Sequence, residues 1–108
     1  MPTVLTSGSQ TATISTEHSL ATVSTDEVIV LTASLANMVN GDVVELRIYG
    51  KVRSTDGEEL LYRGTYGPGK PNPTMVQSVP VTSPHHCRAT LKQTAGTGRA
   101  FVWALYGL

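Results

Sequence analysis

The chain is poor in charge, in aromatic residues and in cysteine. Charged residues make up 15% of its 108 residues and aromatic residues 6%, and the charged share lies below the roughly 25% of an average soluble domain. Eight basic residues balance eight acidic ones, which argues against a dedicated nucleic-acid-binding protein because such proteins usually carry a basic excess. Since Cys87 is alone, no disulfide can form within the chain, and stability must come from packing or association.

Long apolar segments are missing as well. The main unbroken apolar stretch, residues 101–106, is far shorter than the roughly 20 residues that a membrane-spanning helix needs. Residues 1–6 show neither the basic start nor the apolar centre of a secretory signal peptide. We therefore expect a protein that is made in a reducing cytosol, is not secreted by a signal peptide and does not insert into a membrane.

Small hydroxyl residues dominate the beginning of the chain. Threonine favours extended backbone, but serine and threonine bring little to bury in a core. We therefore expect an extended arm over residues 1–19 and a single domain over residues 20–108. The arm would be either a frayed terminus or a segment that orders on a neighbouring subunit by strand addition. In the second case, the contacts would come from Thr11, Thr13, Ile14 and Thr16.

Apolar patterns after residue 26 predict β-strands. Residues 42–53 alternate between apolar and polar side chains, and Asp56-Gly57 favours a tight turn into a returning strand. Residues 34–39 allow one short helical turn, and no segment predicts a long helix. The expected fold is all-β, a single-domain antiparallel β-sandwich or barrel, jelly-roll-like, of about six to eight strands. The expected strands lie near residues 28–31, 42–53, 58–66, 75–81, 87–92 and 99–106.

The last predicted strand is apolar on both faces. Phe101 and Trp103 lie on one face and Tyr106 on the other, so the strand is expected in the centre of a sheet or against another subunit. These three residues are therefore candidate interface anchors. The glycine- and proline-rich residues 67–73 predict a protruding loop that would bring Lys70 to a partner or point it outward.

Acidic and basic residues are distributed unevenly along the chain. Residues 1–46 contain five acidic residues and no Lys or Arg, whereas residues 60–108 contain five basic residues and no Asp or Glu. Two arrangements are open. The two halves can interleave in a sandwich and cancel locally, or they can form separate acidic and basic faces that favour head-to-tail contacts between copies.

No segment carries a convincing catalytic or metal-binding pattern. Residues 64–70 match the spacing of a phosphate-binding loop up to its lysine, but Pro71 stands where Ser or Thr should hold the metal and a helix should begin. His85, His86 and Cys87 are adjacent potential ligands, yet consecutive residues of an extended segment point to opposite sides. We expect no enzymatic activity, no cofactor, no metal and no small-molecule ligand.

Aromatic residues at alternate strand positions leave one other binding role open. They could form a sugar platform, as in a carbohydrate-binding β-sandwich module, although in strands such residues are more often core or interface anchors. The residues concerned are Tyr49, Tyr62, Tyr66, Trp103 and Tyr106.

Two segments resemble a group of small virion structural proteins of tailed bacteriophages. One is GDVVELRIYGKVR at residues 41–53, and the other is ATLKQTAGTGRAF at residues 89–101. A Leu-Tyr-Arg return strand at residues 61–63 lies between them, and in that group strands of this kind recur in this order. The resemblance covers residues 20–108 and leaves out the threonine-rich start of the chain.

The resemblance implies a small β-domain that decorates the virus head. Such a decoration, or cement, protein binds the assembled head and stabilises contacts between subunits of the major capsid protein, its expected partner. We expect a location on the capsid surface and association with further copies of the chain, with a trimer favoured. A tail or head–tail adaptor component is the alternative. If residues 1–19 form an arm, deletion of residues 1–18 should abolish capsid binding and leave the domain folded.

Overall fold

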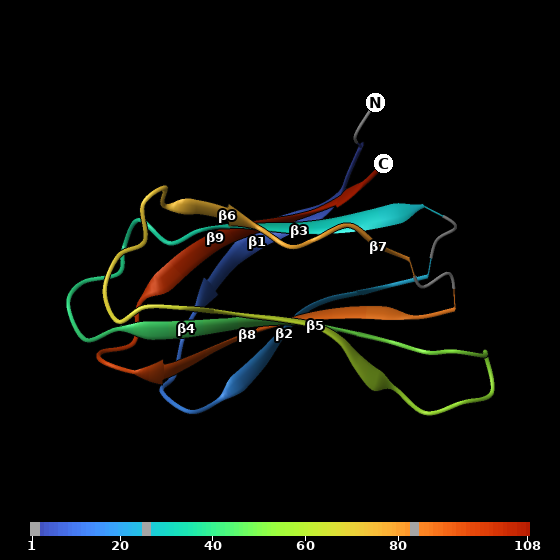
Figure 1. Cartoon of the computed structure of the whole chain (residues 1–108), viewed down its shortest axis with the longest axis horizontal. Coiled ribbons are helices and arrows are strands. Elements are labelled where there is room, and N and C mark those ends of the chain that lie inside the picture. Colours follow the sequence, from blue (N-terminus) through green and yellow to red (C-terminus); the bar gives the residue numbers. More distant parts are fainter. Residues whose placement is uncertain (1–2, 25–26, 83–84) are drawn as a thin grey trace.

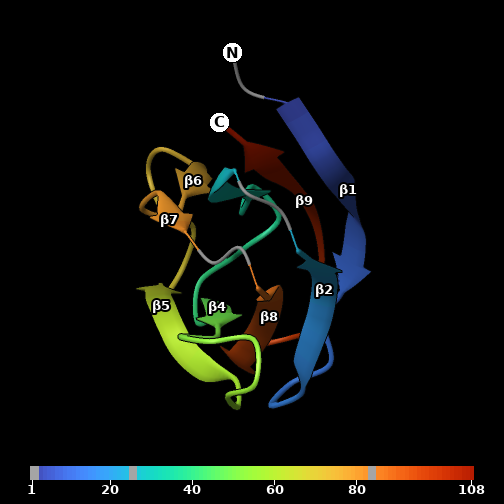
Figure 2. The same ribbon diagram turned by 90° about the vertical axis from the view of Figure 1, so that its right-hand side faces the viewer.

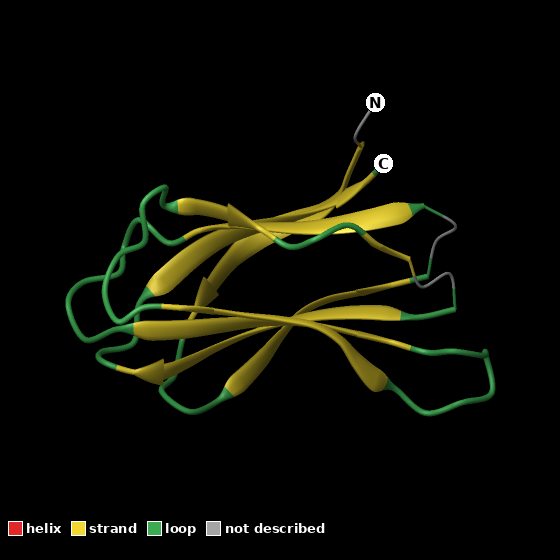
Figure 3. Cartoon of the chain, in the orientation of Figure 1, coloured by secondary structure: helices red, strands yellow, loops and turns green. Residues whose placement is uncertain are grey.

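The computed structural model describes residues 3–24, 27–82 and 85–108. These residues form nine β-strands in two antiparallel sheets that pack face to face (Figure 1, Figure 3). In the five-stranded sheet the order is β1 (Thr3–Thr11), β9 (Ala100–Gly107), β3 (Val28–Ser34) and β6 (Met75–Gln77), and β7 (Val81–Thr82) also pairs with β3. In the four-stranded sheet the order is β2 (Glu17–Val23), β8 (Cys87–Ala95), β4 (Val43–Gly50) and β5 (Glu59–Tyr66).

The expected all-β sandwich is confirmed. The two sheets form a globule with extents of 41 × 30 × 19 Å, and no helix occurs among the described residues. Within this part of the chain there is accordingly no helix of the length and hydropathy that a membrane crossing needs. The strands number nine, one above the expected range, in part because the segment expected as one strand over residues 75–81 is divided into β6 and β7 before and after Pro80, which lacks the N–H that a sheet ladder needs.

The core lies between the sheets and explains the alternation in the sequence. In β4, Val44, Leu46 and Ile48 are fully buried and the residues between them are half-buried, because successive side chains of a strand point to opposite faces. The strands β3, β8 and β9 bury alternate residues against them. The largest fully buried side chains of the core are those of Ile29, Leu31, Leu35, Met38, Leu46, Ile48, Leu91, Phe101 and Leu105.

The extended arm expected over residues 1–19 is not confirmed. Within it, β1 is an edge strand of the five-stranded sheet and pairs with β9, while β2 begins at Glu17 and pairs with β8 at the edge of the other sheet. Figure 2 shows both strands on the same side of the sandwich. Threonine favours strands, and an edge strand needs few apolar side chains, so the hydroxyl-rich sequence is compatible with a place in the sheet.

One buried carboxylate ties together the loops at one end of the sandwich. Asp42, in the loop before β4, is 1% exposed and accepts hydrogen bonds from the backbone N–H of Val39 at 3.0 Å, from that of Thr97 at 3.2 Å and from Nε of Arg99 at 3.0 Å. The bond from Val39, together with those from Arg99 and Thr97, holds the pKa of this carboxyl below its usual value despite burial. The loop between β3 and β4 is thereby fastened to the hairpin between β8 and β9.

Candidate functional site

All charged residues that lie in the described strands belong to the four-stranded sheet. The strands β1, β3, β6, β7 and β9 of the five-stranded sheet, all of them within the described residues, contain no Asp, Glu, Lys, Arg or His. Both sheets contribute to the same core, so their outer surfaces differ in chemistry while their inner surfaces do not. The charged and histidine residues in the strands of the four-stranded sheet are Glu17, His18, Glu45, Arg47, Glu59, Arg63, Arg88 and Lys92.

The outer surface of the five-stranded sheet, here called the uncharged face, includes three rows of side chains that run across the strands. The strand registers place these positions side by side, and they alternate along β9 and β3 with positions that face the core. The rows are Val4–Tyr106–Val30, Ser7–Ala104–Thr32–Gln77 and Ser9–Val102–Ser34–Met75.

Apolar side chains of the uncharged face are exposed around two shallow hollows. Val102 and Met75 are each 62% exposed, and Val4 is 56% exposed. Hollows of about 220 and 530 Å³ share Tyr106 in their linings. Met75 and Val102 both line the smaller hollow, and exposed apolar side chains around a hollow on a surface without charge are typical of protein interaction sites.

Polar groups at this sheet are hydrogen-bonded within the chain. The amide Nε2 of Gln77 donates to Oγ1 of Thr32 at 3.2 Å, and the backbone N–H of Leu31 donates to Oγ of Ser78 at 2.9 Å. Groups that already have partners lose less when a partner protein displaces water from them. The face can therefore be covered without leaving these groups unsatisfied.

The outer surface of the four-stranded sheet carries a network of ion pairs and hydrogen bonds centred on Glu17. Its Oε2 accepts from the hydroxyls of Tyr49 and Thr90, each at 2.7 Å, and its Oε1 lies 3.7 Å from Nη1 of Arg47. Burial raises the pKa of Glu17, but the bonds from Tyr49 and Thr90 and the charge of Arg47 outweigh it, so that the pKa is lowered. Arg47 also pairs with Glu45.

A second ion-pair group at this surface joins the β4–β5 loop to β8. Arg88 donates to both carboxylate oxygens of Glu58 at 2.8 and 3.0 Å, and its guanidinium lies 4.5 Å from the ring centroid of Tyr49. His86 Nε2 lies 2.5 Å from the same carboxylate. The bonds from Arg88, with a further contribution from His86, lower the pKa of Glu58 to about 2.

These contacts distinguish between the two charge arrangements left open by the sequence. Asp42 of the acidic part pairs with Arg99 of the basic part, and the strand registers set Glu17 and Glu45, both of the acidic part, opposite Lys92 of the basic part. In the described residues the acidic and basic parts of the chain therefore interleave and cancel locally. The sandwich has one charged but self-neutralised outer surface and one outer surface without charge.

The predicted interface residues of the last strand occupy different environments. Phe101 is fully buried and Trp103 is 7% exposed, because both face the core. Their side chains are already covered within the chain, so the structure gives no support to the expectation that they contact a partner. Tyr106 lies on the uncharged face and lines both hollows. This strand, β9, lies in the centre of its sheet between β1 and β3. A central place in a sheet was one of the two positions expected for it.

The residues expected to join a neighbouring sheet lie instead near the turn between β1 and β2. Thr11 ends β1, and Thr13, Ile14 and Thr16 lie in the connection. The N–H of Thr16 donates to the carbonyl of Thr13 at 3.0 Å, so the segment is bonded within its own chain. Lys70 is exposed in the β5–β6 loop, as expected.

The candidate metal and sugar residues do not converge. Cys87 is fully buried, whereas the ring of His86 contacts Glu58, and among the described residues no group of three or more His, Cys, Asp or Glu is placed to hold a metal ion. Tyr106 is on the five-stranded sheet, while Tyr49 lies beneath Arg88 on the other sheet. Tyr62 and Tyr66 lie together on β5, with their hydroxyls 3.4 Å apart, but they pack against the core. With Trp103 buried as well, the five candidate residues do not form one platform.

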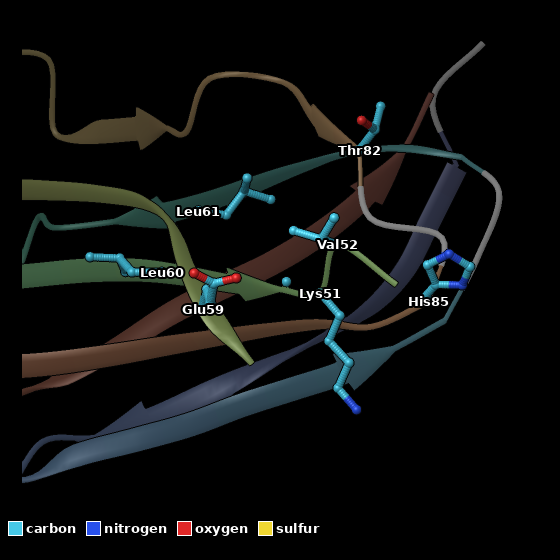
Figure 4. Close-up of a pocket in the computed structure, with 8 residues that line it drawn as sticks. Lys51, Val52, Glu59, Leu60, Leu61, Thr82 and His85 are labelled. Atoms are coloured by element: carbon cyan, nitrogen blue, oxygen red, sulfur yellow. The ribbon is translucent and has the colours of Figure 1, made fainter. Parts of the chain in front are cut away.

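A further hollow of about 430 Å³ lies beside the edge strand β5 and is shown in Figure 4. Val52, Leu60 and Leu61 contribute much of its lining. In Figure 4 the charged ends of Lys51 and Glu59 point in different directions rather than toward one centre. Thr82 and His85 also line this hollow.

Comparison with known proteins identifies no relative. No family model, no curated protein and no solved structure matches this chain. The uncharged face was not predicted from the sequence. The sequence does contain the five segments without charge that form it. What the sequence does not reveal is that β1, β3, β6, β7 and β9 meet in one sheet.

Proposed function

We propose that this chain is a structural protein of a bacteriophage virion, a decoration protein that binds the assembled head through its uncharged face. The sequence resemblance provides the biological setting. The observation that carries the proposal is the division of charge, which leaves one whole sheet surface without an Asp, Glu, Lys, Arg or His in its strands. A protein whose role is to cover other subunits needs such a surface more than it needs a cleft.

Physical costs favour this face over the opposite one. Burial of a charged group in an interface requires its removal from water, at a cost of several kcal/mol unless a partner compensates. The uncharged face avoids that cost and offers the exposed side chains of Val102, Met75 and Val4. Burial of apolar surface contributes about 25 cal/mol per Å².

The size of the chain is adequate for such a role. Its accessible surface is 5637 Å², and a standard protein contact uses about 800 Å² on each partner. One such contact on the uncharged face leaves most of the molecule free for other contacts or for solvent. Because the chain would bind the assembled shell and not the free subunits, it would stabilise the shell by mass action.

The position and copy number of the chain in purified virions test the proposal. A decoration protein is expected all over the head, in copy numbers comparable to those of the major capsid protein. A few copies at one vertex or along the tail would favour the adaptor or tail alternative. Absence from the particle would overturn the virion assignment altogether.

A further inference from the structure

We infer that the outer edge of β1, which pairs with no strand among the described residues, is a docking site for a second copy of this chain, which pairs antiparallel with it across a twofold axis. The inference does not depend on the proposed function, because it concerns the purified chain alone. It rests on a comparison of the sheet edges within this molecule.

Most edges of the two sheets carry features that hinder pairing with another strand. Charges, prolines, bulges and short strands are the usual protections of an edge. β5 carries Glu59 and Arg63 and has a register shift, and β2 carries Glu17 and a register shift. β6 and β7 are three and two residues long and are separated by Pro80.

The edge of β1 differs from these. It is nine residues long, contains neither charge nor proline, and its one register shift, between Val4 and Thr6, leaves residues 6–11 in regular pairing with β9. Ser7, Ser9 and Thr11 along it are exposed. The carbonyl of Thr11 accepts from Nε2 of Gln10 at 2.9 Å. The remaining outward backbone N–H and C=O groups of such an edge strand form a row that is a template for addition of another strand.

A second copy of the chain fits this edge better than an unrelated partner of complementary charge. In a twofold antiparallel pair, each β1 meets the same uncharged sequence, so no like charges oppose each other. Cross-strand pairs of serine and threonine are favourable. Complementary charge cannot select a different partner here, because the strand has none to offer.

The protected edges also determine the symmetry. A ring closed by strand pairing, such as a trimer, needs two different edges of each copy to meet. Since β2, β5 and the β6–β7 edge carry protections, β1 pairs with β1, and the twofold dimer results. The dimer joins the two five-stranded sheets into one, and the uncharged face becomes continuous across both copies.

A charge-swap experiment tests this inference. The double variants Ser7→Lys/Ser9→Lys and Ser7→Glu/Ser9→Glu place like charges on both strands of the pair at exposed positions. Sedimentation should find twice the 11.5 kDa chain mass for the natural chain and the single-chain mass for each variant, with self-association weakened on the order of tenfold or more. An equimolar mixture of the two variants should restore the dimer.

Two controls separate edge pairing from other contacts. Thr65→Lys adds a second cation beside Arg63 on exposed positions of β5 and should leave the dimer intact. Val102→Lys places a charge on β9, inside the uncharged face, and should also leave it intact, whereas it would break a dimer formed by two faces. A monomeric natural chain, or a mixture of variants that stays monomeric, would overturn the inference.

Discussion

Gly8 of β1 lies opposite Trp103 of β9, and a Cβ atom on Gly8 would come within 3.3 Å of the indole ring. The absence of a side chain at this position allows β1 to cover the indole, which leaves Trp103 only 7% exposed. The uncharged face and the outer β1 edge both depend on β1 keeping this place in the sheet.

Replacement of Gly8 should therefore loosen β1. The larger side chain of Gly8→Leu would press against Trp103, and overpacking of this kind costs about 1–3 kcal/mol of the free energy of unfolding. Trp103 is the only tryptophan of the chain, so its fluorescence reports the change directly, with a red shift expected. Gly57→Ala is the control, because a Cβ at Gly57 has no neighbour within 4 Å; equal stability of the two variants would contradict this packing.

Loss of the Asp42 carboxylate should destabilise the sandwich. Asp42→Ala leaves Arg99 and the backbone N–H groups of Val39 and Thr97 without their acceptor. Loss of the acceptor of buried or charged donors should lower the free energy of unfolding by about 2–4 kcal/mol. Urea denaturation measures the loss. Asp56→Ala is the control: its partner Arg53 has a side chain that is 76% exposed, and such surface pairs contribute about 1 kcal/mol or less. A comparable loss in both variants would contradict the structural role of Asp42.

Acid should weaken the fold in part through Glu58. This carboxyl has a pKa of about 2 in the folded chain and an ordinary value of 4.5, so the unfolded chain binds the proton first as the pH falls. Its contribution to stability is fully present above about pH 4.5 and is lost as the pH falls through 2. Glu58→Gln should therefore show a smaller loss of stability between these pH values than the natural chain.

The matched control for this titration is Glu59→Gln, at the neighbouring exposed position. Thermal unfolding measured across the acid range compares the three proteins. Identical pH profiles for the natural chain and Glu58→Gln would show that Arg88 and His86 do not hold this carboxylate as described.

Cys87 should be unreactive in the folded chain. Its side chain is fully buried, and burial raises the pKa of the thiol to about 11, so that little reactive thiolate exists near neutral pH. Iodoacetamide should label it at the rate of unfolding in buffer and rapidly in urea, as mass spectrometry would show. Rapid labelling of the native chain would contradict the position of β8.

The sequence predicts the hairpin and the core well because both depend on local alternation. The pattern of Val44, Leu46 and Ile48 places β4, and Asp56-Gly57 lies in the loop that returns to β5. Sequence reasoning fails where a register shifts: a bulge in β5 sets Leu60 opposite Tyr49, on the outer side, and not with Tyr62 as simple alternation implies.

The place of β1 and the uncharged face could not be predicted from local patterns. A segment rich in serine and threonine is compatible both with an edge strand and with an extended arm. Only its pairing with β9 distinguishes the two. Deletion of residues 1–18, which would be a clean test of an arm, would therefore remove an edge strand and uncover Trp103. Substitutions on the face are the better test of function.

Binding of the purified chain to phage heads that lack it tests the central claim most directly. The natural chain should saturate the heads, and Val102→Glu, which introduces a charge at a 62% exposed position of the uncharged face, should bind at least about tenfold more weakly, equivalent to about 1.4 kcal/mol. Thr65→Lys on the opposite sheet should bind like the natural chain. Full binding of Val102→Glu, or no binding of the natural chain to the heads, would contradict the account.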